Sequence, residues 1–212
     1  QLSIPISMEG GEAIENKIEN LHFFIDKGLL YFGPTWNHSL DWVSSGYDET
    51  YNQSKLKNIG LNKFGIEIIK TCEENQVLID VSHIGEKSFW DIYQHSKKPF
   101  IASHSSVYKI CPHFRNLKDD QIKAIKKKQG LIGVNPYPFF IDPTFKKRHQ
   151  EILIKYKSEL NNIEKSFSTK SEIWIMKQHF LQKKLVNICP EFDIFIDHID
   201  YIKKLIGIDF IA

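Results

Sequence analysis

Short apolar runs alternate with longer amphipathic stretches along most of the chain. A short run of apolar and β-branched residues without polar alternation is typical of a buried strand in a parallel sheet. An apolar residue at every third or fourth position indicates instead a helix with one buried face. The sequence thus predicts five strands and the beginning of a sixth. These strands are Leu2–Met8, Leu29–Phe32, Val77–Ser82, Phe100–Ser103, Leu131–Val134 and, at the end, Ile208–Ala212.

Amphipathic stretches fall between these predicted strands, and each has an apolar stripe that indicates a buried helix face. In the last stretch, the stripe consists of Phe192, Phe195, Ile199 and Ile202. The predicted helices are Glu12–Lys27, Leu61–Asn75, Glu86–Ser96, Lys118–Gln129 and Glu191–Leu205.

This alternation predicts an α/β fold with a parallel sheet. A doubly wound sheet and a (β/α)8 TIM-type barrel both fit the pattern. No GxGxxG motif follows a predicted strand, and candidate functional residues at successive strand ends favour the barrel. We expect one domain over residues 1–212, with a charged helical insertion at about 144–185. Because the chain begins inside one predicted strand and ends as another begins, we expect the barrel to be incomplete in these residues.

Two histidines occupy matching positions at the ends of consecutive predicted strands. His83 follows the run Val77–Ser82, and His104 follows Phe100–Ser103, so that a serine precedes each histidine. Parallel α/β folds place their chemistry at the carboxyl edge of the sheet. The two imidazoles are therefore predicted to face one site, and their pairing favours a metal site over two unrelated structural histidines.

Composition narrows the classes of function. The 212 residues, 42% of them hydrophobic, suffice for a sizeable core. With 28 basic and 26 acidic residues, the net charge of +2 argues against a nucleic-acid-binding protein. The odd number of widely spaced cysteines (Cys72, Cys111 and Cys189) predicts no disulfide framework, and nothing in the sequence singles out Cys111 as a nucleophile. No apolar run is long enough to span a membrane, and the compartment stays open.

Several short motifs stand out in a fixed order along the chain. They are Met8-Glu9-Gly10-Gly11, DVSHIG at 80–85, PFIASHSS at 99–106, HFRNLKDDQIKAI at 113–125, GLIGVNPYP at 130–138 and the final IDFIA at 208–212. Together they resemble the membrane dipeptidase (renal dipeptidase-like) family of zinc peptidases. This resemblance implies a barrel fold as well.

The resemblance also implies roles for four residues. Glu9 falls where the family has its metal-bridging glutamate, and His83 and His104 match the two histidines that hold one of its zinc ions. Arg115 matches the arginine that binds the carboxylate of the substrate, a task for which the planar, bidentate guanidinium is suited.

The chain departs from the family pattern at one further position. Trp36 stands where some members carry a substrate-binding histidine, and it would form an apolar or aromatic wall there. His38, two positions later, need not take over the hydrogen bond of that histidine. The family's N-terminal His-x-Asp is absent from these residues, and its late catalytic aspartate is expected beyond Ala212. No catalytic residue is therefore assigned.

The function expected from this resemblance is zinc-dependent hydrolysis of small dipeptides. Two Zn²⁺ ions in the full-length protein would turn a bridging water into hydroxide near neutral pH and polarise the scissile carbonyl. A related amidohydrolase acting on another small amide or lactam, and a metal-free binding scaffold, remain as alternatives. Whether the protein forms a homodimer stays open. The 212 residues alone are expected to be inactive and poorly soluble, because unpaired strand edges invite aggregation.

Overall fold

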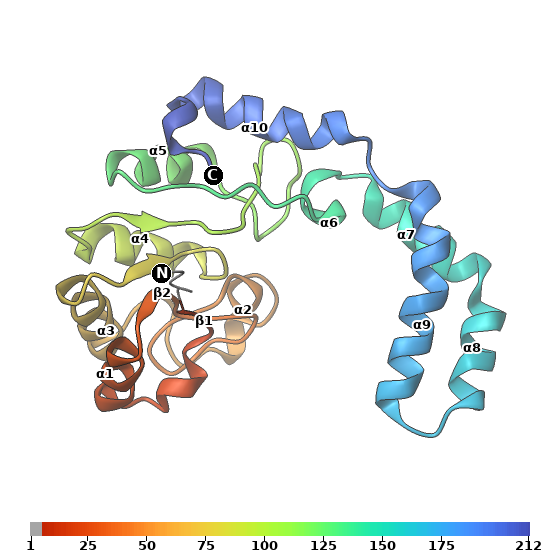
Figure 1. Ribbon diagram of the computed structural model, residues 1–212, viewed down its shortest axis with the longest axis horizontal. Helices are drawn as coiled ribbons and strands as arrows, with labels where there is room; N and C mark the ends of the chain where they lie inside the picture. Colours follow the sequence, from red (N-terminus) through yellow and green to blue (C-terminus); the bar gives the residue numbers. More distant parts are fainter. Residues whose placement is uncertain (1–5) are drawn as a thin grey trace, which may run out of the picture.

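The computed structural model describes residues 6–212, and it is built on a parallel sheet whose strands follow one another in chain order (Figure 1). Each strand pairs in parallel with the next, in the order β1-β2-β3-β4. The predicted parallel α/β sheet is thus confirmed, while Leu2–Pro5 of the first predicted strand lies outside the described residues. The strands are β1 (Ile6–Glu9), β2 (Leu29–Gly33), β3 (Leu78–Asp80) and β4 (Phe100–Ile101).

The last two predicted strands are wrong in extent, although they lie where the sheet continues. In the segment Leu131–Val134 a single residue, Ile132, forms parallel bridges to Ala102 and Ile211. The predicted strand start at Ile208–Ala212 begins instead with a 3-10 turn, because the chain leaves the preceding helix at a glycine with positive φ and reaches extended backbone only at Ile211. Backbone hydrogen bonds nevertheless carry the sheet order on through Ile132.

Helices connect the strands, mostly as predicted. The expected helix Glu12–Lys27 is divided in two, because Glu15 and Asn16 adopt the left-handed conformation, with φ of 49° and 55°. A right-handed helix cannot continue through such residues. The helices before the projecting segment are η1 (Gly11–Ile14), α1 (Ile18–Asp26), α2 (Gly46–Tyr51), η2 (Gln53–Lys55), α3 (Lys63–Glu74), α4 (Glu86–His95), α5 (Asp119–Lys127) and α6 (Pro138–Ile141).

The charged segment at 144–184 is helical, as predicted, and projects from the rest of the molecule (Figure 1). Its longest helix buries only Leu181, so little packing ties it to a core. That this segment is an insertion into the domain stays a prediction. No helix among residues 6–212 is long and apolar enough to cross a membrane. The remaining helices are α7 (Phe145–Lys155), α8 (Lys157–Ser166), α9 (Lys170–Leu185), η3 (Val186–Ile188), α10 (Phe192–Ile206) and η4 (Ile208–Phe210).

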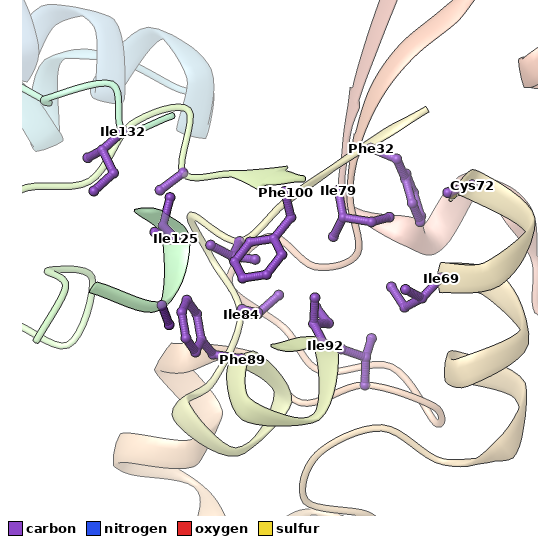
Figure 2. Packing of buried hydrophobic residues seen from close by; sticks show 14 of the residues in the cluster. Phe32, Ile69, Cys72, Ile79, Ile84, Phe89, Ile92, Phe100, Ile125 and Ile132 are labelled. Atoms are coloured by element: carbon purple, nitrogen blue, oxygen red, sulfur yellow. The ribbon is translucent and has the colours of Figure 1, made fainter. Parts of the chain in front are cut away.

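The core lies between the sheet and the helices that cross over it (Figure 2). Phe100 of β4 and Phe89 of α4 meet edge to face, with ring centroids 5.7 Å apart. Ile79 of β3 and Ile92 of α4 are fully or almost fully buried beside them. This packing fixes where β3 and β4 end, and therefore where the residues after them point.

The buried face of α10 differs from the predicted stripe. Phe192 is 70% exposed, whereas His198 is fully buried, together with Ile202. The imidazole of His198 accepts a hydrogen bond at Nδ1 from the backbone N–H of Val107 (2.9 Å) and donates from Nε2 to the carbonyl of Ile141 (3.0 Å). His198 thus joins α10 to the loop after β4 and to α6. The apolar periodicity of the sequence does not reveal this residue, because histidine is polar.

Replacing His198 by phenylalanine is expected to destabilise the fold. The variant leaves the Val107 N–H and the Ile141 carbonyl buried without a partner, at a cost of about 1–3 kcal/mol each. Urea unfolding at pH 7.5 measures the loss. His179→Phe on the exposed face of α9 serves as the control, and an equal effect of both substitutions would contradict this role.

The wild type and His198→Phe also test the protonation state of His198. Burial lowers the pKa of this imidazole, and the hydrogen bond to Ile141 and the charge of Asp197 only partly offset it. As the pH falls below about 6.5, the unfolded chain binds a proton that the native state excludes, so the wild type loses stability. The difference in unfolding free energy between wild type and His198→Phe should therefore narrow between pH 7 and pH 5.

Candidate metal and substrate site

Three side chains with metal-binding atoms converge at the carboxyl edge of the sheet. Glu9 is the last residue of β1, and His83 and His104 lie in the turns after β3 and β4. Glu9 Oε1 is 2.9 Å from Nε2 of His83 and 3.2 Å from Nε2 of His104. The two Nε2 atoms are 3.0 Å apart. The expectation that these residues face one point agrees with the structure.

The spacing of these atoms suits a bound cation. A carboxylate oxygen and two unprotonated imidazole nitrogens are all acceptors, so they repel one another unless a proton or a cation lies among them. Ligands about 2.0–2.2 Å from one tetrahedral zinc ion are roughly 3.3–3.6 Å from each other. The three observed distances, 2.9–3.2 Å, are somewhat shorter than that range. The donor set of two nitrogens and one oxygen is one that zinc accepts.

Electrostatics keep both histidines neutral. Burial is the main cause of the lowered pKa of His83 and His104, and the positive charge of Arg115 adds to it. The same two causes lower the pKa of His113 to about 4, together with Lys146. Neutral imidazole is the form that binds metal, so the site presents its lone pairs throughout the physiological range of pH.

A buried carboxylate holds the two histidine-bearing turns together. Asp80, the last residue of β3, accepts hydrogen bonds from the backbone N–H groups of Ser82 and Ser103, both at 3.0 Å. Sequence reasoning missed Asp80. The signal that could have found it is the pattern Asp-x-Ser before His83, since an aspartate that ends a strand commonly bonds to the backbone two residues later.

Arg115 lies on the loop after β4 and is 8% exposed. Its Nε donates to the carbonyl of Ser82 at 2.6 Å, and its guanidinium lies over the ring of Phe140, 5.3 Å from the centroid. Its Nη2 is buried and has no hydrogen-bond partner among the described residues. Burial lowers its pKa to about 10, so the group stays charged near neutral pH. An unpaired cationic N–H group is suited to bind an oxyanion.

A cavity of about 680 Å³ opens beside His83 and Arg115. Trp36 is 49% exposed and its ring lies 6.4 Å from that of His83, so it forms part of an aromatic wall. His38 is exposed and does not line the cavity. The other lining residues are Asn37, Tyr47, Tyr51, His113, Phe114, Tyr137, Phe139, Phe140 and Lys146.

The thiol of Cys111 does not offer an alternative nucleophile. Burial and the nearby Asp142 raise its pKa to about 11, so the thiolate is scarce at neutral pH. Cys72, Cys111 and Cys189 are all free, in agreement with the absence of a disulfide framework.

A curated protein is similar in sequence to part of this chain. The chain is 37% identical over 135 residues to an uncharacterised protein encoded in the PQQ-III 3′ region of Acinetobacter calcoaceticus; the match covers 64% of this chain and 42% of that protein. The chain thus spans less than half the length of this relative.

Solved structures agree with the fold. The probable dipeptidase PvdM from Pseudomonas aeruginosa matches with a TM-score of 0.72 at 19% identity, over 97% of this chain and 55% of that one. A metallopeptidase from Rhodobacter sphaeroides, liganded with a phosphinate mimic of L-Ala-D-Ala, matches with a TM-score of 0.57 at 28% identity, over 66% of this chain and 39% of that one.

The model of the membrane dipeptidase family, peptidase family M19, matches residues 1–212, which is the whole chain. Two of the similar solved structures are named metallopeptidases, and the glutamate and two histidines of this chain form a group that could hold a metal ion. The chain belongs to the membrane dipeptidase family of metallopeptidases.

Proposed function

We propose that the protein carrying this chain is a zinc-dependent dipeptidase, and that Glu9, His83 and His104 bind one ion. The observation that carries the proposal is the convergence of their three acceptor atoms, 2.9–3.2 Å apart, near a buried arginine whose Nη2 has no hydrogen-bond partner among the described residues. The dipeptide mimic bound to the Rhodobacter metallopeptidase supports a dipeptide as the class of substrate.

Each residue of the site has a separate task in this proposal. A metal ion held by Glu9, His83 and His104 would supply an acidified water molecule and would polarise the scissile carbonyl. Glu9 and the two neutral imidazoles would hold this ion, and His83 also lines the cavity. Arg115 binds the C-terminal carboxylate of the dipeptide and so orients the peptide bond over the metal. Trp36 covers one side of the cavity with an aromatic wall.

A second zinc ion that shares Glu9 is part of the proposal. Glu9 is half exposed, with 49% of its side chain accessible, and its carboxylate would contribute to holding a further ion. Among residues 6–212, Glu9, His83 and His104 are the group of three that could hold a metal, so the second ion would need further ligands. Two ions sharing a carboxylate are typical of aminopeptidases and related hydrolases.

We also propose that the sheet belongs to a (β/α)8 barrel, with 144–185 as a helical insertion. The support is the chain-order parallel pairing of β1 to β4 and its continuation through Ile132 and Ile211. A barrel places functional residues at the carboxyl ends of several strands, and Glu9, His83 and His104 lie at such ends. An experimental structure of the complete protein in which the sheet stays open would contradict this.

Removal of metal tests the function directly. The complete protein, dialysed against a chelator, is expected to lose hydrolysis of simple dipeptides by at least about 10²-fold and to regain it on addition of zinc. The alternatives give different results. A related amidohydrolase would bind zinc but leave dipeptides intact, and a metal-free scaffold would contain no stoichiometric zinc as purified.

A further inference from the structure

Asp80 binds both histidine-bearing turns through serine hydroxyls as well as through backbone N–H groups. It is 4% exposed and accepts four hydrogen bonds. Ser82 donates to Oδ1 from its backbone N–H at 3.0 Å and from its hydroxyl at 2.6 Å. Ser103 donates to Oδ1 from its backbone N–H at 3.0 Å and to Oδ2 from its hydroxyl. One carboxylate therefore fixes both turns.

The positions of the hydroxyl protons determine the state of His104. A serine hydroxyl has one proton, and the protons of Ser82 and Ser103 both point to Asp80. The oxygen of Ser82 then accepts from the backbone N–H of His104 at 3.0 Å. The oxygen of Ser103, 2.7 Å from Nδ1 of His104, can only accept there, so Nδ1 carries the ring proton. This leaves the lone pair of Nε2 directed at Glu9, 3.2 Å away.

We propose that Asp80 and Ser103 are positioning residues that hold His104 in the Nδ1–H tautomer, with Nε2 free to bind metal. The proposal rests on the proposed function in one respect, namely that a metal ion is what Nε2 binds. His83 has no such support, because its Nδ1 is buried without a hydrogen-bond partner among the described residues. The Asp80–Ser103 pair therefore acts through one of the two histidines.

Ser103→Ala tests this with the smallest structural change, since it removes one hydroxyl and keeps the backbone N–H that Asp80 binds. We expect it to weaken zinc binding, measured by competition with a chromophoric chelator, by about 10- to 100-fold. Ser103→Thr retains a hydroxyl and should restore most of the affinity. In Asp80→Asn the amide oxygen can keep the two backbone N–H groups at the place of Oδ1, while its NH₂ group stands at the place of Oδ2 against the Ser103 hydroxyl. That hydroxyl then accepts and turns its own proton to Nδ1 of His104, so zinc binding should weaken at least as much.

Asp142→Asn is the matched control. Asp142 is 5% exposed and accepts from the backbone N–H and hydroxyl of Thr144, two residues later, at 2.8 and 2.7 Å. It also pairs with Arg148, and among residues 6–212 its side chain forms no hydrogen bond or ion pair with either histidine-bearing turn. The substitution Asp142→Asn therefore removes a buried carboxylate in the same way, but outside the metal site. Zinc affinity should be unchanged in Asp142→Asn, whereas both aspartate variants should have a lower free energy of unfolding than the wild type.

The outcomes separate the two proposals. Zinc binding in Ser103→Ala as tight as in the wild type, or equally weakened in Asp142→Asn, would overturn the positioning role. A wild-type protein that binds no zinc would refute the metal centre, and ring ¹⁵N chemical shifts of His104 in the metal-free protein then decide the remaining question. The Nδ1–H form in the wild type and its loss in Ser103→Ala support the role of Ser103; the same tautomer in both proteins refutes it.

Discussion

Glu9→Gln is expected to lower kcat/KM for dipeptide hydrolysis by about 10³-fold or more, the largest effect of any substitution in the site. The carboxylate of Glu9 lies between the imidazoles of His83 and His104, 2.9 and 3.2 Å from their Nε2 atoms. A neutral amide at this point is a weak metal ligand, and its NH₂ group is suited to fill the place of the cation by donating to the imidazoles. The zinc content of the purified variant should fall in parallel with its activity.

The control for this substitution is Glu19→Gln. Glu19 is an exposed residue in the first turn of α1, so its replacement removes the same charge close in sequence but outside the site. We expect wild-type activity and zinc content from it. Full zinc content in Glu9→Gln with unchanged kinetics would show that Glu9 is not a ligand.

Arg115→Lys is expected to lower kcat/KM by about 10²-fold, chiefly by raising KM. Removing one partner of a desolvated charge pair costs about 2–5 kcal/mol of binding free energy. An ammonium group cannot reproduce the planar, bidentate contact of a guanidinium with a carboxylate. The guanidinium also donates from Nε to the carbonyl of Ser82, which lysine reaches with a different geometry. Steady-state kinetics with a free dipeptide measure the loss.

A dipeptide with an amidated C-terminus separates recognition of the substrate from damage to the site. If Arg115 binds the carboxylate, amidation should weaken hydrolysis by the wild type but cause little further loss in Arg115→Lys. Arg148→Lys, which changes an arginine paired with Asp142, is the control and should discriminate against the amide as the wild type does. Equal hydrolysis of free and amidated dipeptides by the wild type would exclude this role for Arg115.

Local patterns in the sequence predicted the parallel α/β sheet and the edge at which the site lies. The apolar runs before His83 and His104 become β3 and β4, and parallel pairing in chain order brings the ends of those strands together. Glu9 needed the family motif as well, because a glutamate before two glycines is by itself a common turn. The motifs also led to Arg115, whose buried and partly unpaired guanidinium only the structure reveals.

Other features were decided by contacts between residues far apart in the sequence. The strand expected at Leu131–Val134 is reduced to the two bridges of Ile132, because pairing depends on the neighbouring strands rather than on the run itself. His198 is buried because backbone groups of Val107 and Ile141 need partners, which an apolar stripe cannot indicate.

The sequence by itself determined the order of strands and helices and which residue types stand at the strand ends, because periodicity and turn chemistry are local. The tertiary structure alone decided that Asp80 receives both serine hydroxyls, and hence which nitrogen of His104 carries the proton. Ser103 lies 23 residues from Asp80. A hydrogen bond over that separation exists only after β3 and β4 have paired, so no local pattern encodes it.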